Sequence, residues 1–362
     1  MVYKRCGIFY RHLLVWSFLI IFSQGFIFAQ TYWVRYGWQT FRNAGDARIL
    51  ALGGHQAADV GTSVTPLFNP AATGQVGLHS ITYAHQSRLA GMINSDLLSF
   101  PLTILNHRPV NVIFLHEGIS QIPDTRSLLL DFGADGIPGT GDIGEGNGIL
   151  DEGERLDEED LKYFSQRQLG LYFSTAWVWK KFRVGFGLKG LHHILGEFSA
   201  VGIGMDLGLY ILPWKDGRIG LTMRDITTSW LVWNNGSVER TAPALLIGVA
   251  QQFNFSRFPL SVIGYSSLEI EAAGQSVDDD FKIGSRGGNF HLGVNLVYDY
   301  KVAIRLGRNG VGATTAGLGL SWSNFSLDYA FQAEPQGSGL GTSHYTSMSF
   351  NPAWLKTILS RL

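Results

Sequence analysis

The amino-acid sequence predicts an all-β protein: a 14-stranded antiparallel transmembrane β-barrel with an N-terminal plug segment. Three observations lead there: the composition, apolar residues at every second position, and connections that alternate between short and long. Hydrophobic residues make up 45% of the 362 residues, charged residues only 16%, and there are 45 glycines. Soluble proteins carry about 25% charged residues. After Phe28 no run of 18 apolar residues could form a spanning helix, which leaves a barrel as the expected membrane fold.

The first 29 residues are expected to be a signal peptide and not part of the fold. Lys4, Arg5 and Arg11 precede an apolar run from Leu13 to Phe28, and Ala29 is a small residue at a plausible cleavage site. An uncleaved membrane anchor is the alternative. The single cysteine of the chain lies in this segment, so the exported protein would have no disulfide.

Residues 30–76 are predicted to form a plug inside the barrel. Within them, "AGDARILALGGHQAADVGTSVTPLFNPAATG" (residues 44–74) is rich in alanine and glycine and does not alternate. It predicts a short helix, a break at Gly53 and Gly54, and a turn at Asn69 and Pro70 that leads into the first strand.

Residues 77–350 are predicted to form the barrel. In "KFRVGFGLKG" and "FHLGVNLVYD", apolar residues alternate with glycine, polar and charged ones, as expected for strands between lipid and a polar lumen. A soluble sandwich or propeller is the alternative. The fourteen expected strands are 78–86, 94–102, 110–118, 167–178, 182–193, 201–212, 217–225, 244–253, 259–270, 289–298, 301–309, 314–322, 325–333 and 342–350.

The connections predict how the barrel is oriented. Every second one is short, such as "WKK", "PWKDGR" and "DYK", whereas the others are longer and polar or glycine-rich. Outer-membrane barrels have short turns in the periplasm and long loops outside. Aromatic residues near strand ends are expected to form an interfacial girdle: Trp177, Trp179, Trp214, Trp230 and Trp322.

The longest connection, residues 119–166, is predicted to be an acidic extracellular loop. Its stretch from Asp131 to Asp160 holds eleven acidic residues and one base, Arg155. Two abutting twelve-residue windows, from Asp131 and from Ile143, partly match the spacing of a calcium loop. The candidate calcium ligands are Asp131, Asp135, Asp142, Glu145, Asn147, Asp151 and Glu154. The alternatives are a solvated acidic surface and electrostatic docking of a basic partner.

The last residues, 351–362, are predicted to form an amphipathic helix. Asn351 can cap it with Pro352 in its first turn, and Trp354, Leu355 and later leucines form an apolar stripe. The helix would lie on the periplasmic membrane surface or pack across the barrel mouth.

The plug segment also carries a resemblance to a known family. Ala47, Arg48, Ala51, Leu52, Gly53 and Gly54, followed by "NPA" at residues 69–71, resemble the start of the PorV/PorQ family of outer-membrane proteins. His55 stands where this pattern would have a small residue. The family is related to FadL-type fatty-acid channels and is linked to the type IX secretion system. The resemblance implies a fourteen-stranded barrel with an N-terminal plug, and cargo handling or surface attachment rather than catalysis.

These observations predict a protein in the outer membrane of a Gram-negative bacterium, in contact with outer-membrane lipid. We find no nucleophile-elbow, paired-histidine or phosphate-loop motif and no basic patch, so we expect no enzyme, no obligatory cofactor and no nucleic-acid partner. Calcium in the acidic loop is the one cofactor suggested. The leading expectation is protein secretion or attachment, with secreted cargo or secretion components as partners. The alternatives are a transporter of hydrophobic small molecules and a porin-like protein without specific cargo.

Overall fold

The computed structural model describes most of the chain that follows the predicted signal peptide. The described residues are 31–34, 38–75, 80–104, 108–125, 128–157, 159, 161–255, 257–272, 274–275, 279–334 and 339–354. The predicted signal peptide and residues 355–362 of the predicted C-terminal helix lie outside them. None of the described helices is long and apolar enough to cross a membrane.

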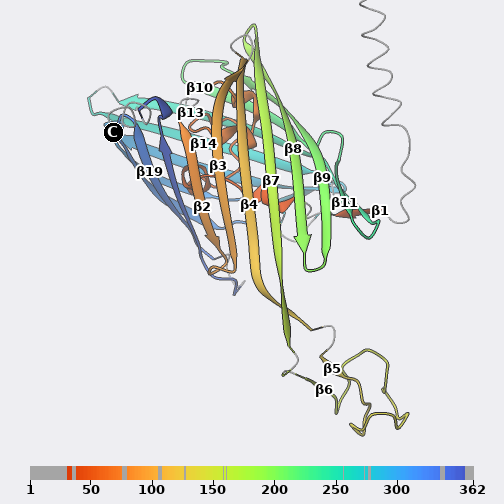
Figure 1. Cartoon of the computed structure of the whole chain (residues 1–362). Helices are drawn as coiled ribbons and strands as arrows, with labels where there is room; N and C mark the ends of the chain where they lie inside the picture. The colour runs from red at the N-terminus through yellow and green to blue at the C-terminus, as the bar shows by residue number, and fades with distance from the viewer. Residues whose placement is uncertain are drawn as a thin grey trace, which may run out of the picture.

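Fourteen antiparallel strands close into a barrel, which confirms the predicted fold (Figure 1). Each pairs with its neighbour in the wall, and β20 pairs with β2 to close the ring, with Ile81 opposite Phe350 and Ser87 opposite His344. The wall strands are β2 (Ile81–Arg88), β3 (Ile93–Ile104), β4 (Arg108–Asp124), β7 (Lys162–Trp179), β8 (Phe182–Leu195), β9 (Phe198–Ile211), β10 (Gly217–Arg224), β13 (Ala244–Phe255), β14 (Leu260–Glu271), β16 (Arg286–Tyr298), β17 (Val302–Arg308), β18 (Thr314–Ser321), β19 (Phe325–Gln332) and β20 (Ser343–Phe350).

The alternating pattern sorts side chains between the lumen and the outside. Along β7, Gln168, Tyr172 and Ser174 are buried on the lumen side, whereas Leu169 and Leu171 are exposed on the outer face. The other wall strands repeat this pattern, so a band of exposed leucine, valine, isoleucine and phenylalanine surrounds the barrel. An apolar surface of this extent requires lipid around it, because soluble proteins rarely expose large contiguous apolar patches. The barrel therefore belongs in the outer membrane.

The two ends of the barrel differ. Short turns join β7 to β8, β16 to β17 and β18 to β19 at one end, where Trp177, Trp179, Trp214 and Trp322 are exposed. Long connections follow β4, β10, β14 and β19 at the other end, although β2–β3 and β8–β9 are joined tightly there. The β4–β7 hairpin extends beyond the barrel rim and carries the acidic loop (Figure 1).

Several short strands were not expected. β4 runs to Asp124 and β7 starts at Lys162, so both strands enter the predicted loop 119–166, where β5 (Leu129–Leu130) pairs with β6 (Arg155–Leu156). In the connection after β10, β11 (Ser229–Trp233) and β12 (Val238–Thr241) form a hairpin, and β1 (Thr31–Val34) pairs with β12 in parallel. β15 (Phe281–Ile283) pairs antiparallel with the start of β16. Trp230 is therefore a strand residue of the long-loop end, stacked under Arg240, and not part of the tryptophan group at the short-turn end.

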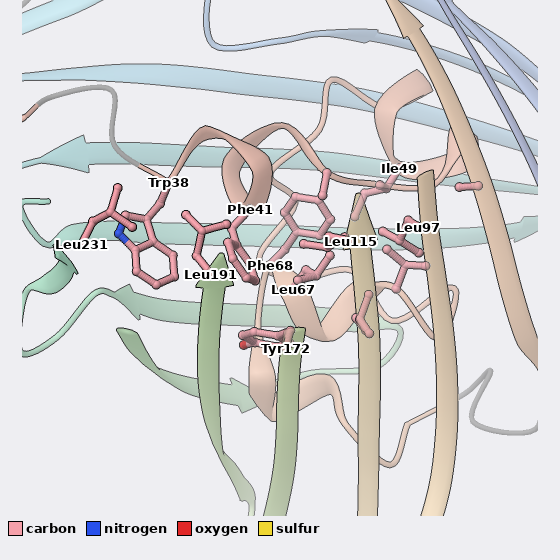
Figure 2. Packing of buried hydrophobic residues seen from close by; sticks show 14 of the residues in the cluster. Trp38, Phe41, Ile49, Leu67, Phe68, Leu97, Leu115, Tyr172, Leu191 and Leu231 are labelled. Atoms are coloured by element: carbon pink, nitrogen blue, oxygen red, sulfur yellow. The ribbon is translucent and has the colours of Figure 1, made fainter. Parts of the chain in front are cut away.

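The plug fills the lumen, as predicted. It consists of α2 (Gln39–Asn43), α3 (Ala47–Ala51) and the 3-10 helices η1 (Thr65–Leu67) and η2 (Pro70–Ala72). Asp46 caps α3 by accepting a hydrogen bond from the Ile49 backbone N–H, at 2.8 Å. The main apolar core forms between plug and wall, where Trp38, Phe41, Ile49, Leu67 and Phe68 of the plug meet Leu97, Leu115, Tyr172, Leu191 and Leu231 of the wall (Figure 2).

Candidate functional site

Inward-facing glycines of the wall make room for the plug backbone. A Cβ added at Gly185 of β8 would lie 2.1 Å from the Ala71 nitrogen, and one at Gly208 of β9 would lie 2.2 Å from Asn69 Oδ1. The same close approach to the plug backbone recurs around the ring at Gly220, Gly293 and Gly307, and Gly317 lies equally close to the Ala51 Cβ. Any side chain at these positions would collide with the plug. The high glycine content is thus partly explained by the seating of the plug in the lumen.

The residues predicted to end the plug helix and to form its turn do so, and they also contact the wall. Gly53 and Gly54 have φ angles of 85° and 65°, a left-handed conformation that ends α3. Asn69 is fully buried; its Nδ2 donates to the carbonyls of Ala57 and Leu209, at 2.8 and 3.1 Å. Asn69 and Pro70 begin η2, which packs on β8 and β9. This pair therefore anchors the plug to the wall, rather than only turning the chain toward the first strand.

Buried charges line the lumen and are paired. Lys189 of β8 lies 2.9 Å from Asp206 of β9 and 2.5 Å from Asp225, which follows β10. Arg305 of β17 lies 2.6 Å from Asp328 of β19. Unpaired charges would be strongly disfavoured at such sites, whereas paired ones keep the lumen polar. Alternation placed these side chains inward but did not reveal which of them pair, because the partners come from different strands.

The wall is interrupted where β10 ends. β10 pairs with β9 only over Ile219–Met223, and farther along β9 its place is taken by β11. Between β10 and β11, Asp225 and Thr228 have positive φ angles, 54° and 68°, so the chain bends away from the direction of β10. The Asp225 backbone N–H donates to Asp206 Oδ1 at 2.9 Å, which ties the bend to β9.

A small cavity lies between this interruption and the plug. It has room for about one water molecule, at about 20 Å³. Trp38, Phe41 and Leu67 of the plug and Tyr172 of the wall contribute its apolar lining, and Lys189 lies 5.8 Å from the centre of the Trp38 ring. Thr241, Ala242 and Ala244 line it from the wall side, and the rest of the lining is charged: Arg42, Asp206, Arg224, Asp225 and Glu271. The cavity is therefore lined by aromatic and charged side chains together, and in this closed arrangement it holds no more than a water molecule.

A larger vestibule of about 390 Å³ opens toward the long-loop end. Its lining combines plug residues such as Arg42, Gly54 and His55 with wall residues such as Glu269 and His291. The plug therefore forms part of the wall of this vestibule. Gly53 and Gly54 were predicted from the sequence, but the three titratable side chains His55, Glu269 and His291 were not, because they come from three separate segments.

The acidic loop is organised by its own carboxylates. Asp131 accepts hydrogen bonds from the backbone N–H groups of Gly146 and Gly148, both at 2.7 Å, and these bonds lower the pKa of Asp131. Glu154 likewise accepts from Gly133 and Asp151. Asp142 accepts from Asp135, Glu145 from Gly139 and Gly141, and the Asn147 side chain donates to Asp151.

The predicted calcium ligands thus lie in one compact loop. Within the described residues, however, three potential metal-binding His, Asp or Glu atoms converge within 4.8 Å at His55, Glu269 and His291, and not in this loop. Calcium binding by the loop stays a prediction. The carboxylates that it would need now cap glycine-rich backbone turns, which is a second physical reason for the acidity of this segment.

The fold and the occupied lumen define the class: this is a plugged, fourteen-stranded β-barrel of the outer membrane. No family model matches the sequence. No curated protein matches it either.

Several solved outer-membrane barrels are similar in structure. The Pseudomonas putida toluene transporter TodX has a TM-score of 0.46 and 12% identity, over 85% of this chain and 98% of that one. The CymD monoaromatic hydrocarbon channel has a TM-score of 0.48 and 14% identity, over 84% and 97%. A Pseudomonas aeruginosa FadL homologue has a TM-score of 0.42 and 12% identity, over 85% and 99%. Because these TM-scores and sequence identities are low, we assign the architecture of this chain from its own strand pairing and transfer no function from these structures.

Proposed function

We propose that this protein is a gated outer-membrane channel for small hydrophobic molecules, with plug residues 38–75 as the gate. The observation that carries the proposal is the cluster of plug aromatics beside the interruption of the wall at β10. Trp38 and Phe41 are buried there among Leu67 and Tyr172 and enclose a cavity too small for anything but water. A solute can therefore enter only when the plug shifts.

The chemistry of this region favours apolar or aromatic solutes. Aromatic rings bind other rings through stacked or tilted contacts, and Trp38 and Phe41 already make such a contact at 5.4 Å. Charged side chains line the same cavity, so the proposed preference for apolar solutes depends on the aromatic rings and not on a wholly apolar lining. The charged pair of Lys189 and Asp225 lies at the edge of this cluster, where it would contact a polar substituent of the solute. The proposal includes no catalytic step.

Uptake of an apolar fluorescent probe and of a small neutral sugar into proteoliposomes tests this function. The intact protein should pass the apolar probe faster than protein-free vesicles and should exclude the sugar. Trp38→Ala should change probe uptake, whereas Trp322→Ala, on the outer face at the short-turn end, should not. Deletion of residues 44–74 should leave a barrel that passes both solutes. If the intact protein passes the sugar as readily as the apolar probe, the proposal is wrong.

A role in protein export or surface attachment is the second candidate. The feature that favours it is the β4–β7 hairpin, which carries the acidic loop away from the barrel rim (Figure 1). Capture of partners from detergent-solubilised outer membranes, with the full protein and with a variant in which a short Gly-Ser turn replaces residues 129–156, tests this role. Secreted proteins or secretion components retained only by the full protein would support it.

A further inference from the structure

Three side chains that can bind metals meet at the floor of the vestibule. His55 directly follows the Gly53–Gly54 turn of the plug, Glu269 lies on β14 and His291 on β16. Their ligand atoms all lie within 4.8 Å of one another. Glu269 and His291 are buried, at 3% and 5% exposure, and the His55 side chain is 14% exposed.

The protons of the two imidazoles can be assigned from their other partners. His55 Nε2 lies 2.7 Å from the Arg42 carbonyl oxygen, and His291 Nδ1 lies 2.9 Å from the Gly53 carbonyl oxygen. A carbonyl oxygen only accepts, so each of these nitrogens carries a hydrogen. In the neutral imidazoles, His55 Nδ1 and His291 Nε2 therefore hold lone pairs.

Both lone pairs face the same carboxylate oxygen. His55 Nδ1 lies 2.6 Å from Glu269 Oε2, and His291 Nε2 lies 3.4 Å from it. His291 Nε2 is buried and makes no hydrogen bond with any described residue. Three acceptors that face one another repel unless a cation or an added proton lies between them. Histidines that donate one ring N–H to a backbone carbonyl and turn the other nitrogen inward are typical of metal sites.

The surrounding charges keep Glu269 ionised. Arg224 and Arg42 donate to the other oxygen, Glu269 Oε1, at 2.6 and 3.0 Å, and Arg42 also pairs with Glu271. Nearby positive charge favours the carboxylate form of Glu269. Glu271 offsets the positive charge of Arg42. Arg224 is therefore the main positive charge that opposes a bound cation, and its Nη2 lies 3.4 Å from His55 Nδ1.

We propose that His55, Glu269 and His291 bind a transition-metal ion of the zinc class. Two imidazoles and one carboxylate select such ions over calcium or magnesium, which prefer oxygen ligands. Tetrahedral bonds of about 2.0–2.1 Å place ligand atoms roughly 3.3 Å apart, so small rotations of these side chains form the site. Three protein ligands leave a fourth position open to the vestibule.

A bound ion would connect the plug to the wall. One ligand belongs to the plug turn and two belong to neighbouring wall strands, so the ion would hold the plug closed from the vestibule side. The inference does not depend on which solute the barrel passes, and metal binding is measured without transport.

The test uses the purified full-length protein in detergent, stripped with a chelator. Calorimetric titration with zinc should show one ion per chain, and cobalt(II) should give the visible absorption of a tetrahedral site. His55→Gln and His291→Gln should each weaken zinc binding by at least the roughly 10–100-fold that loss of an outer-shell partner costs, because each removes a ligand itself. His85→Gln is the matched control, because His85 pairs with Asp96 on the outer face of the barrel, at 2.9 Å, and should leave the binding unchanged.

A ligand-preserving variant separates metal binding from a purely structural role. In a Cys6→Ser background, His291→Cys should still bind cobalt and should add a thiolate-to-cobalt charge-transfer band, since thiolate is also a ligand of this metal class. Absence of stoichiometric zinc binding in the stripped wild-type protein would overturn the proposal and would favour a proton between His55 and Glu269. Equal zinc affinity of wild type and His291→Gln would overturn it as well.

Discussion

Arg48 and Asp59 form a bidentate ion pair inside the plug, with Nη1 and Nη2 of the guanidinium at 2.6 and 2.9 Å from the two carboxylate oxygens. Arg48 lies on α3, Asp59 lies eleven residues later, and both are buried. Arg48 also donates to the hydroxyl of Tyr265 on β14, at 3.2 Å. The arginine of the plug motif therefore holds the plug together and fastens it to the wall.

Arg48→Met should destabilise the seated plug by about 3 kcal/mol, because it leaves the buried Asp59 carboxylate without its ion-pair partner and with only the hydrogen bonds from Gly61 and Thr65. The opening free energy of plug amides in native-state hydrogen exchange measures this. The double variant Arg48→Met with Asp59→Leu should recover part of the loss, since it removes the unpaired charge. A single variant as stable as wild type would contradict the structural role of this pair.

Gly53→Ala should prevent the plug from seating, whereas Gly54→Ala should not. A Cβ on Gly53 would lie 2.3 Å from the Arg308 carbonyl oxygen, but a Cβ on Gly54 would have nothing nearer than a Leu50 methyl at 4.0 Å. Both residues have positive φ, so the Gly54 variant bears only a backbone cost of about 1 kcal/mol. Ion conductance in planar bilayers should rise for Gly53→Ala alone. Equal conductance of the two variants would mean that the close approach at Gly53 is unimportant.

The short-turn and long-loop ends predict a sidedness. Protease added to intact cells should cut within residues 119–166 and spare the turn "PWKDGR", because these segments lie at opposite ends of the barrel. Immunoblots against tags placed at both ends would show the fragments. Cleavage of the acidic loop only after the outer membrane is permeabilised would show that the barrel has the opposite orientation.

Acidification should loosen the acidic loop. Hydrogen bonds from the Gly148 and Gly146 N–H groups lower the pKa of Asp131, so the folded loop gains stability above the ordinary aspartate pKa of about 4. That stability is lost as the pH falls through the lowered pKa of Asp131. The amide chemical shifts of Gly146 and Gly148 should therefore move toward unfolded values below about pH 4. In Asp131→Asn, which cannot titrate, these two shifts should show no such transition.

Millimolar calcium should protect residues 131–154 from protease if the predicted ligands bind it, and a chelator should reverse this. Magnesium should substitute poorly, because it demands octahedral geometry. Asp135→Asn combined with Asp151→Asn should weaken the protection and leave the heat-resistant barrel intact. If titration calorimetry detects no calcium binding at concentrations several times a dissociation constant of about 1 mM, the prediction is wrong. The acidic residues would then serve only to solvate the loop and to cap its backbone turns.

Local patterns in the sequence were enough to predict the barrel. A strand turns alternate side chains to opposite faces, so the period of two in segments such as 182–193 and 289–298 revealed both the strands and the face that meets lipid. The break at Gly53 and Gly54 and the turn at Asn69 were also readable, because backbone conformation at such positions depends on the residue itself.

Contacts between distant segments decided the rest. β1, β11 and β12 are too short to show a period, and their pairing depends on where β10 leaves β9. The partners of the inward glycines became visible only once the plug lay against them. Likewise His55, Glu269 and His291 meet because β14 pairs with β16 and the plug turn lies against both strands. Alternation states which way a side chain points, but only the closed barrel with its plug determines what it faces.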